Sequence, residues 1–143
     1  MPPFTPKTPY LTTDGVVEVY DSNTQEFLGI VLIERKYPPL GFALPGGFVD
    51  VGERVEDAVV REMKEEISLD VTITHLLGVY SDPARDPRFH TASVVYVCKA
   101  YGNPKGADDA KKAYLLDPQK IDLTTLVFDH ATIIQDYLKY KNL

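Results

Sequence analysis

Residues 54–67 carry the pattern that most restricts how this chain can fold. Four apolar side chains recur there at every fourth position, namely Val55, Val59, Met63 and Ile67. Because an α-helix turns about 100° per residue, this spacing gathers the four side chains on one face. The segment is therefore predicted to be a helix that buries this face against a core.

Three carboxylates lie beside the apolar face of the predicted helix. Glu65 and Glu66 follow Glu62 by three and four residues, so all three share one side of the helix. Like charges at this spacing destabilise an isolated helix by about 0.2–0.5 kcal/mol per pair. A divalent cation would remove the repulsion, since Mg²⁺ prefers carboxylate, water and phosphate oxygens. The segment is interpreted as a metal site for phosphate chemistry; on the charges alone, a solvated acidic face is the alternative.

The whole chain, residues 1–143, is predicted to form one α/β domain. Residues 1–13 are proline-rich and are expected to be an extended lead-in, and 102–112 a polar loop. A closing helix is expected at 128–141, and strands or short extended pieces are expected at 16–20, 27–34, 43–44, 48–49, 71–80, 92–101 and 113–116. The alternation of strands with helices favours an α/β sandwich with a mixed sheet.

Charge, cysteine content and hydropathy limit the partners and the compartment. The net charge is −6 with no cluster of Lys or Arg, which argues against a nucleic-acid partner. The single cysteine, Cys98, lies in an apolar run and is expected to be a buried thiol. No segment approaches the roughly 18 apolar residues of a membrane span, and no signal-peptide core is present. We therefore expect a cytoplasmic protein with no membrane partner.

The helix belongs to a longer motif that begins at a glycine. Five residues separate Gly47 from Glu53, and seven more separate Glu53 from the adjacent pair Arg61-Glu62. Two further residues lead to the adjacent pair Glu65-Glu66. This pattern resembles the signature of the Nudix hydrolase family, with Ser68 in place of the family's late glycine. Six matched positions, each at about 6% of average usage, arise by chance in roughly one chain in 10⁵. The resemblance implies a Nudix-type α/β/α sandwich with a mixed β-sheet.

The resemblance also implies catalytic and metal-binding roles. In this family the Glu-Glu pair, here Glu65 and Glu66, binds Mg²⁺ or Mn²⁺. Glu62 is expected to ligate a metal or to act as the base toward the attacking water. The backbone carbonyl of the residue before the first glycine, here Gly46, often supplies another oxygen. A later loop carries the base in some relatives, so Asp108 or Asp109 is the alternative.

Two further motif residues are expected to support the metal ligands from behind. Arg61 cannot ligate a cation, but its planar guanidinium can hold Glu53 and other carboxylates in place. Arg35 ends a predicted strand just before the glycine loop and is expected to reach substrate phosphates, although a solvent-facing side chain is an equal alternative. Phe48 follows the two glycines and is expected to stack on a base or a ribose, although core packing is an equal alternative.

A second motif follows the strand after the helix, in the segment YSDPARDPRFH at 80–90. Its two prolines fix φ and stiffen the loop, and Arg85 and Arg88 present guanidinium groups suited to phosphate. The segment resembles the Ser-x-Pro-x-Arg-Asp-Pro-Arg loop of ADP-ribose pyrophosphatase-like members, with Phe89 in place of a frequent glycine. The alternative is a rigid turn whose arginines pair with Asp82 and Asp86.

The resemblance as a whole implies an enzyme that hydrolyses a diphosphate joined to a nucleoside. ADP-ribose, split to AMP and ribose 5-phosphate, is the expected substrate, and Mg²⁺ or Mn²⁺ the cofactor. Three alternatives remain: a nucleoside triphosphate pyrophosphatase, a non-catalytic sensor of ADP-ribose, and an acidic protein-interaction domain. A homodimer is also expected, because relatives are frequently dimers.

Overall fold

The structure, a computed structural model, describes residues 4–106 and 110–143. Seven strands and two α-helices make up this part of the chain, with two short 3₁₀ segments before the second helix. In chain order the elements are β1 (Tyr10–Tyr20), β2 (Phe27–Arg35), β3 (Phe42–Ala43), β4 (Gly46–Phe48), α1 (Val55–Ile67), β5 (Thr72–Tyr80), β6 (Thr91–Tyr101), β7 (Ala110–Leu116), η1 (Pro118–Lys120), η2 (Leu123–Thr125) and α2 (His130–Lys141).

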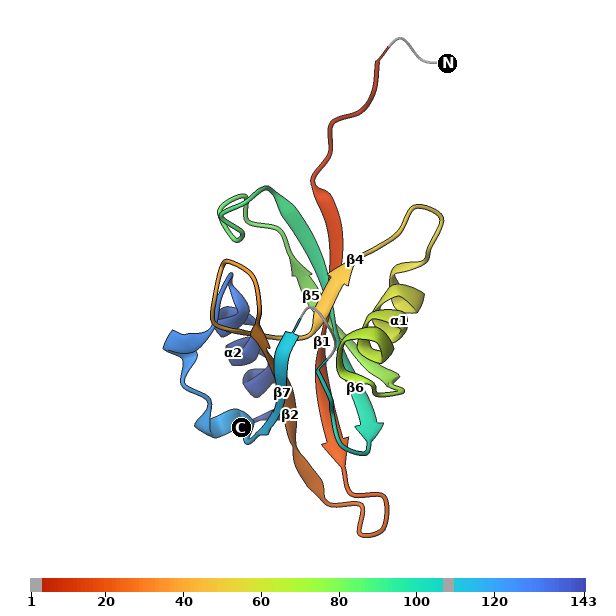
Figure 1. The fold of residues 1–143 in the computed structure, drawn as a ribbon, viewed down its shortest axis with the longest axis vertical. Coiled ribbons are helices and arrows are strands. Elements are labelled where there is room, and N and C mark those ends of the chain that lie inside the picture. The colour runs from red at the N-terminus through yellow and green to blue at the C-terminus, as the bar shows by residue number, and fades with distance from the viewer. Residues whose placement is uncertain (1–3, 107–109) are drawn as a thin grey trace.

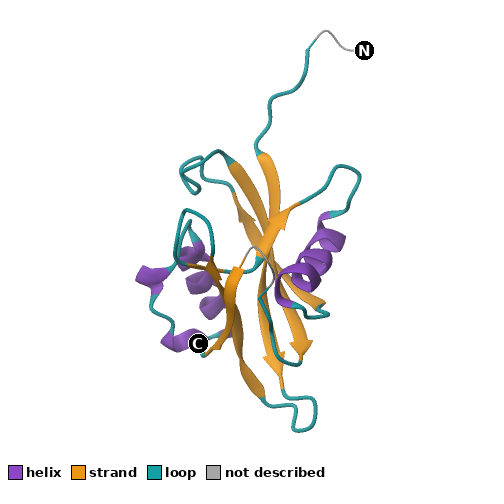
Figure 2. Ribbon diagram, viewed as in Figure 1, coloured by secondary structure: helices purple, strands orange, loops and turns teal. Residues whose placement is uncertain are grey.

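All seven described strands join one mixed sheet, as the sequence predicts. Its main order is β3-β2-β1-β6-β5, with β4 paired to β1 and β7 paired to β2. The central strand β1 runs parallel to β6 and antiparallel to β2 and β4. Figure 1 shows α1 and α2 on opposite sides of this sheet, and Figure 2 shows the same layers by element type.

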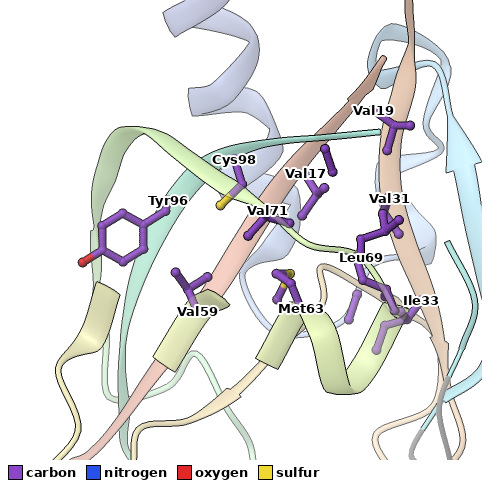
Figure 3. Packing of buried hydrophobic residues seen from close by; sticks show 13 residues of the cluster. Val17, Val19, Val31, Ile33, Val59, Met63, Leu69, Val71, Tyr96 and Cys98 are labelled. Atoms are coloured by element: carbon purple, nitrogen blue, oxygen red, sulfur yellow. The ribbon is translucent and has the colours of Figure 1, made fainter. Parts of the chain in front are cut away.

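The two helices cover opposite faces because strand side chains alternate. Val17 of β1 packs in the cluster of α1, whereas the adjacent Val16 packs in the cluster of α2. The predicted apolar face of α1 is confirmed, since Val59 and Met63 are completely buried among the sheet residues that Figure 3 shows. The predicted α/β/α sandwich is therefore confirmed, and the motif carboxylates lie on α1, which packs against the face of the sheet that contains Val17.

The first strand is longer than the sequence suggests. It begins at Tyr10 rather than at residue 16, so the lead-in is confined to the residues before it. The polar residues Thr12, Thr13 and Asp14 pair with β4 on one side and with β6 on the other. Hydrogen bonding to strands so distant in the chain leaves no pattern in the local sequence. A polar segment that lacks a strand pattern is predicted to be a loop.

Other boundaries also differ. The short extended pieces predicted at 43–44 and 48–49 are β3 at Phe42–Ala43 and β4 at Gly46–Phe48. Strand β7 begins at Ala110, not at residue 113, because its ladder with β2 continues to Arg35. Helix α2 begins at His130 rather than at residue 128, because Phe128 has a left-handed backbone conformation with φ of 57°. The predicted strands at 92–101 and 71–80 agree with β6 and β5 to within one residue.

The expectation that Cys98 is a buried thiol is confirmed. Cys98 is completely buried, and burial raises the pKa of its thiol to about 12, which suits an inert core residue. Neither helix in the described part of the chain is long and apolar enough to cross a membrane.

Ser68 ends α1 in the left-handed region that the family's glycine would favour. Its φ and ψ are 61° and 33°, and its N–H donates to the Lys64 carbonyl at 3.2 Å. A residue with a Cβ is disfavoured there by about 1 kcal/mol relative to glycine. We expect Ser68→Gly to raise the free energy of unfolding by about 1 kcal/mol in urea denaturation, with activity unchanged. Ser68→Ala is the control, because it keeps the backbone cost; equal stability of both variants would contradict the expectation.

Candidate active site

A cleft of about 390 Å³ opens beside the carboxylates of α1. It is bounded by α1, β4, the ends of β1 and β2, the loop before β6 and the residues that lead into α2. Its charged and aromatic lining residues are Asp14, Arg35, Tyr37, Phe48, Asp50, Glu62, Glu66, Arg85, Asp86, Arg88, Phe128 and His130. Six of the predicted site side chains therefore meet in one cavity although they come from four segments.

The two glycines of β4 lie directly against two carboxylates of α1. The Gly46 N–H donates to Glu66 Oε2 at 3.4 Å. A Cβ added to Gly47 would lie only 2.5 Å from the carboxylate atoms of Glu62. No side chain fits at Gly47 without displacing that carboxylate, so the glycine of the motif is required for the close approach of β4 to α1.

Arg61 binds the motif carboxylates from behind, as predicted. Its Nε and Nη2 donate to both oxygens of Glu53 at 2.7 and 2.9 Å, a bidentate pair. Its Nη1 donates to Glu62 Oε1 at 3.0 Å and to Glu65 Oε2 at 3.1 Å. Its Nη2 also donates to the Phe48 carbonyl at 3.1 Å, which ties the helix to the end of β4. One guanidinium thus holds three carboxylates and the end of β4 in place.

The three acids of the helix are not equivalent. Glu62 and Glu66 line the cleft, whereas the Glu65 side chain is 60% exposed and does not line it. Burial raises the pKa of Glu62, although the charge of Arg61 opposes this. A partly buried carboxylate with a raised pKa gains most from a nearby cation. The structure therefore ranks Glu62 and Glu66 above Glu65 as residues that face the cleft.

The residues present fit a hard divalent cation. Glu62 and Glu66 offer carboxylate oxygens, which are the ligands that such a cation prefers. Both lie against the backbone of Gly46 and Gly47, without intervening side chains. Within residues 4–106 and 110–143, no three acid, histidine or cysteine side chains are already grouped as ligands. Arg61 Nη1 donates to one oxygen of Glu62 and to one oxygen of Glu65.

Glu53 offers a stability test that is independent of activity. Its bidentate pair with Arg61 lowers its pKa to about 2 from an ordinary value near 4.5. A carboxylate whose pKa is lower in the folded state than in the unfolded state stabilises the fold. This stabilisation is complete above the pKa of the unfolded state and is lost as the pH falls toward the pKa of the folded state. We expect Glu53→Gln to be less stable than wild type by a constant amount above pH 5, and the difference to shrink from pH 4.5 to pH 2. Urea midpoints across this range measure it; a difference that does not vary with pH would contradict it.

The loop at 80–90 uses its two arginines differently. The Arg85 side chain is 4% exposed and donates to both oxygens of Asp129, at 2.7 and 3.0 Å, and to Thr91 Oγ1 at 2.7 Å. It therefore anchors the loop to the start of α2. Arg88 pairs with Asp86 at 2.9 Å, as the alternative interpretation of a rigid turn suggests, but it is more exposed. A direct contact of Arg85 with substrate stays a prediction.

Arg35 and Phe48 lie at the cleft, where the sequence suggests. Arg35 Nε donates to the Pro39 carbonyl at 2.7 Å, which holds its guanidinium at the end of β2. Phe48 is 45% exposed and lies 5.9 Å from the Tyr10 ring and 6.1 Å from the Phe89 ring. This exposure favours a surface aromatic group over a core residue for Phe48.

Sequence reasoning missed a buried polar group at the base of the cleft. Asp14 accepts a hydrogen bond from Ser93 Oγ and lies 3.9 Å from His130 Nε2. His130 Nδ1 accepts from the Leu44 N–H at 2.9 Å, and burial lowers the pKa of this imidazole. The ring is thus neutral with its proton on Nε2, toward Asp14. The pairing of β1 with β4 and β6 places Asp14 next to Ser93. No local sequence pattern indicates this pairing.

The two loop acids that are alternatives for the base, Asp108 and Asp109, lie outside the described residues. A catalytic role for either of them stays a prediction.

Comparison with known proteins agrees with this architecture. The family model described as the NUDIX domain matches residues 9–137. The chain therefore belongs to the Nudix hydrolase family. A protein of Methanocaldococcus jannaschii named ADP-ribose pyrophosphatase is 47% identical over 137 residues, which are 94% of this chain and 76% of that protein.

Solved structures of the family share the fold. A MutT/nudix family protein from Enterococcus faecalis superposes with a TM-score of 0.79 at 30% identity, covering 98% of this chain and 64% of that one. The NUDIX domain of Shewanella oneidensis NrtR, solved with ADP ribose, has a TM-score of 0.79 at 24% identity and covers 97% and 94%. At that identity the second likeness indicates the shared fold only.

Proposed function

We propose that this protein hydrolyses the diphosphate of ADP-ribose to AMP and ribose 5-phosphate, using Mg²⁺ or Mn²⁺. One observation carries the proposal: a single cleft contains Glu62 and Glu66, packed against the β4 glycines, together with Arg35 and Arg88. Carboxylates suit a cation and guanidinium groups suit phosphate oxygens. The 47% identity to a protein named ADP-ribose pyrophosphatase supports this choice of substrate.

The residues that would hold the cation are Glu62, Glu66 and the backbone of Gly46, with Glu65 joining from the exposed side. When bound, the cation neutralises phosphate charge and favours ionisation of the attacking water. Arg61 keeps the carboxylates oriented through its bonds to Glu53 and Glu62. We assign Glu62 as the group that takes the proton from water, and Asp108 or Asp109 as the alternative base.

The substrate-binding side chains in this proposal are Arg35, Arg88 and Phe48, with Arg85 acting through the loop that it anchors. Arg35 and Arg88 would bind phosphate oxygens, and the exposed ring of Phe48 would stack on the base or a ribose. A small nucleotide is the only partner the site requires; a homodimer and a cytoplasmic location stay predictions.

Substrate profiling tests the proposal. ADP-ribose, NADH and the nucleoside triphosphates are each incubated with Mg²⁺ or with EDTA, and products are identified by mass spectrometry in ¹⁸O water. We expect AMP and ribose 5-phosphate from ADP-ribose, one of them labelled, and no turnover in EDTA. Turnover of triphosphates alone would replace the proposal with a nucleotide pyrophosphatase. Tight binding of ADP-ribose without turnover would indicate a sensor.

A further inference from the structure

Phe128 occupies an unusual backbone position at the edge of the cleft. It lies between η2 and α2, lines the cleft and is half-buried. Its φ is 57°, in the left-handed region. The other described non-glycine residues with positive φ are Gln25, Ser68 and Asn142, so Phe128 is the aromatic member of that set. A bulky residue is disfavoured in this conformation, which glycine or asparagine adopts more easily.

The surrounding contacts fix this backbone independently of the ring. The Val127 N–H donates to the Phe42 carbonyl at 2.9 Å, just before Phe128. Asp129, just after it, accepts both bonds from Arg85. The chain could therefore make this turn with a residue that has no ring. An aromatic residue in a disfavoured conformation at a functional cleft points to a use for the side chain.

The ring of Phe128 contacts two of the three arginines that line the cleft. The Arg35 Cζ lies 5.1 Å and the Arg88 Cζ 5.5 Å from the ring centroid, both over the ring. Each guanidinium has further contacts: Arg35 donates to the Pro39 carbonyl, and Arg88 pairs with the Asp86 carboxylate and lies 5.0 Å from the centroid of the Phe89 ring. Both distances are within the range of a cation–π interaction.

Two like charges gathered on one ring require a counter-charge. Burial lowers the pKa of Arg35, and the nearby charge of Arg88 lowers it further, against the opposing effect of Asp86. Asp86, Glu66 and Asp14 offset this effect only in part, so the pKa of Arg35 stays lowered, whereas the pair with Asp86 raises the pKa of Arg88. An anionic group of the substrate between the guanidinium groups would add a further counter-charge.

We propose that Phe128 is a positioning residue that holds Arg35 and Arg88 together as a clamp for the diphosphate of the substrate. Phe128 itself forms no bond to the reacting atoms; it acts through the two guanidinium groups. This inference rests on the proposed function for the identity of the substrate, but the clamp concerns diphosphate binding and can be measured without turnover.

Removing the aromatic face while keeping an apolar side chain tests the clamp. We expect Phe128→Leu to raise KM for ADP-ribose about tenfold and to change kcat less than threefold, because two cation–π contacts are lost from substrate binding. In EDTA, Kd for ADP in isothermal titration calorimetry should rise about tenfold as well. Phe128→Tyr, which keeps the ring, should restore both values to within about twofold of wild type.

Tyr101 supplies the matched control, because its ring also contacts a cation, Lys99 at 5.4 Å, but it does not line the cleft. Tyr101→Leu should leave KM and the ADP affinity unchanged. If F128L does not fold, pentafluorophenylalanine placed at position 128 keeps the shape and reverses the ring quadrupole. The same tenfold losses are then expected.

The outcomes separate this inference from the proposed function. Unchanged KM and ADP affinity in Phe128→Leu, or in the fluorinated protein, would overturn the clamp even if ADP-ribose is hydrolysed. A fall in kcat at constant KM would overturn it too, since it would place Phe128 in the chemical step. If wild type hydrolyses no diphosphate, the proposed function fails, and the ADP titrations still decide the clamp.

Discussion

Glu66→Gln should lower kcat for ADP-ribose by at least about a thousandfold and leave the fold intact. Glu66 lines the cleft and accepts the Gly46 N–H, so its carboxylate lies where β4 and α1 meet. The amide keeps the shape and loses the charge that a cation needs. Metal ions stabilise transition-state charge by several kcal/mol, and each 1.4 kcal/mol is a factor of ten in rate. Steady-state kinetics over a Mg²⁺ titration measure kcat and the cation affinity together.

Glu65→Gln is the matched control on the same helix. Its carboxylate is mostly exposed and contacts the site through Arg61, so a loss of about 10- to 100-fold is expected. Thermal melts of both variants should agree with wild type to within a few degrees. A larger loss for Glu65→Gln than for Glu66→Gln would show that the exposed acid is the principal ligand, contrary to the ranking that the cleft geometry indicates.

The parts of the site that lie close together in the chain could be predicted from the sequence. The four-residue spacing of α1 predicts both its buried face and the acids beside it, because helix geometry relates residues one turn apart. The family resemblance predicts that the backbone of Gly46 lies near the acids, whereas the close approach of Gly47 to Glu62 is seen only in the structure. The pair of Arg61 with Glu53 follows from the positions of these two residues in the family motif.

Contacts between distant segments could not be predicted in this way. Arg85 lines the cleft, but its partner Asp129 is 44 residues later, so no local pattern indicates this pair. Asp14 lies between the predicted lead-in at 1–13 and the predicted strand at 16–20, and only its pairing with β4 and β6 makes it part of a strand. Phe128 gives no signal at all, because its left-handed backbone depends on contacts of its neighbours. Tertiary pairing decides such positions, and one sequence does not reveal it.

Gly47→Ala should separate activity from stability at the β4–α1 contact. The added Cβ would lie 2.5 Å from the Glu62 carboxylate, which is the end of a flexible side chain and can move aside. The fold should therefore hold, with a melting temperature within a few degrees of wild type. Glu62 would leave its position beside Arg61, and a displacement of about 1 Å can cost a hundredfold in rate. We expect kcat to fall at least about a hundredfold.

Gly46→Ala makes the matched comparison, because its Cβ would meet the Thr13 backbone carbonyl and Asp14 instead. Backbone of the central strand cannot move aside as a side chain does, so overpacking should cost about 1–3 kcal/mol of stability in urea denaturation. The two adjacent glycines would then have different effects. Gly47→Ala would lower the rate by displacing the Glu62 carboxylate, and Gly46→Ala would lower the stability by overpacking against β1. Wild-type kcat in Gly47→Ala would contradict a catalytic position for Glu62. Equal destabilisation of both variants would show that the Glu62 side chain is held as rigidly as the backbone, because it then could not yield to the added methyl group.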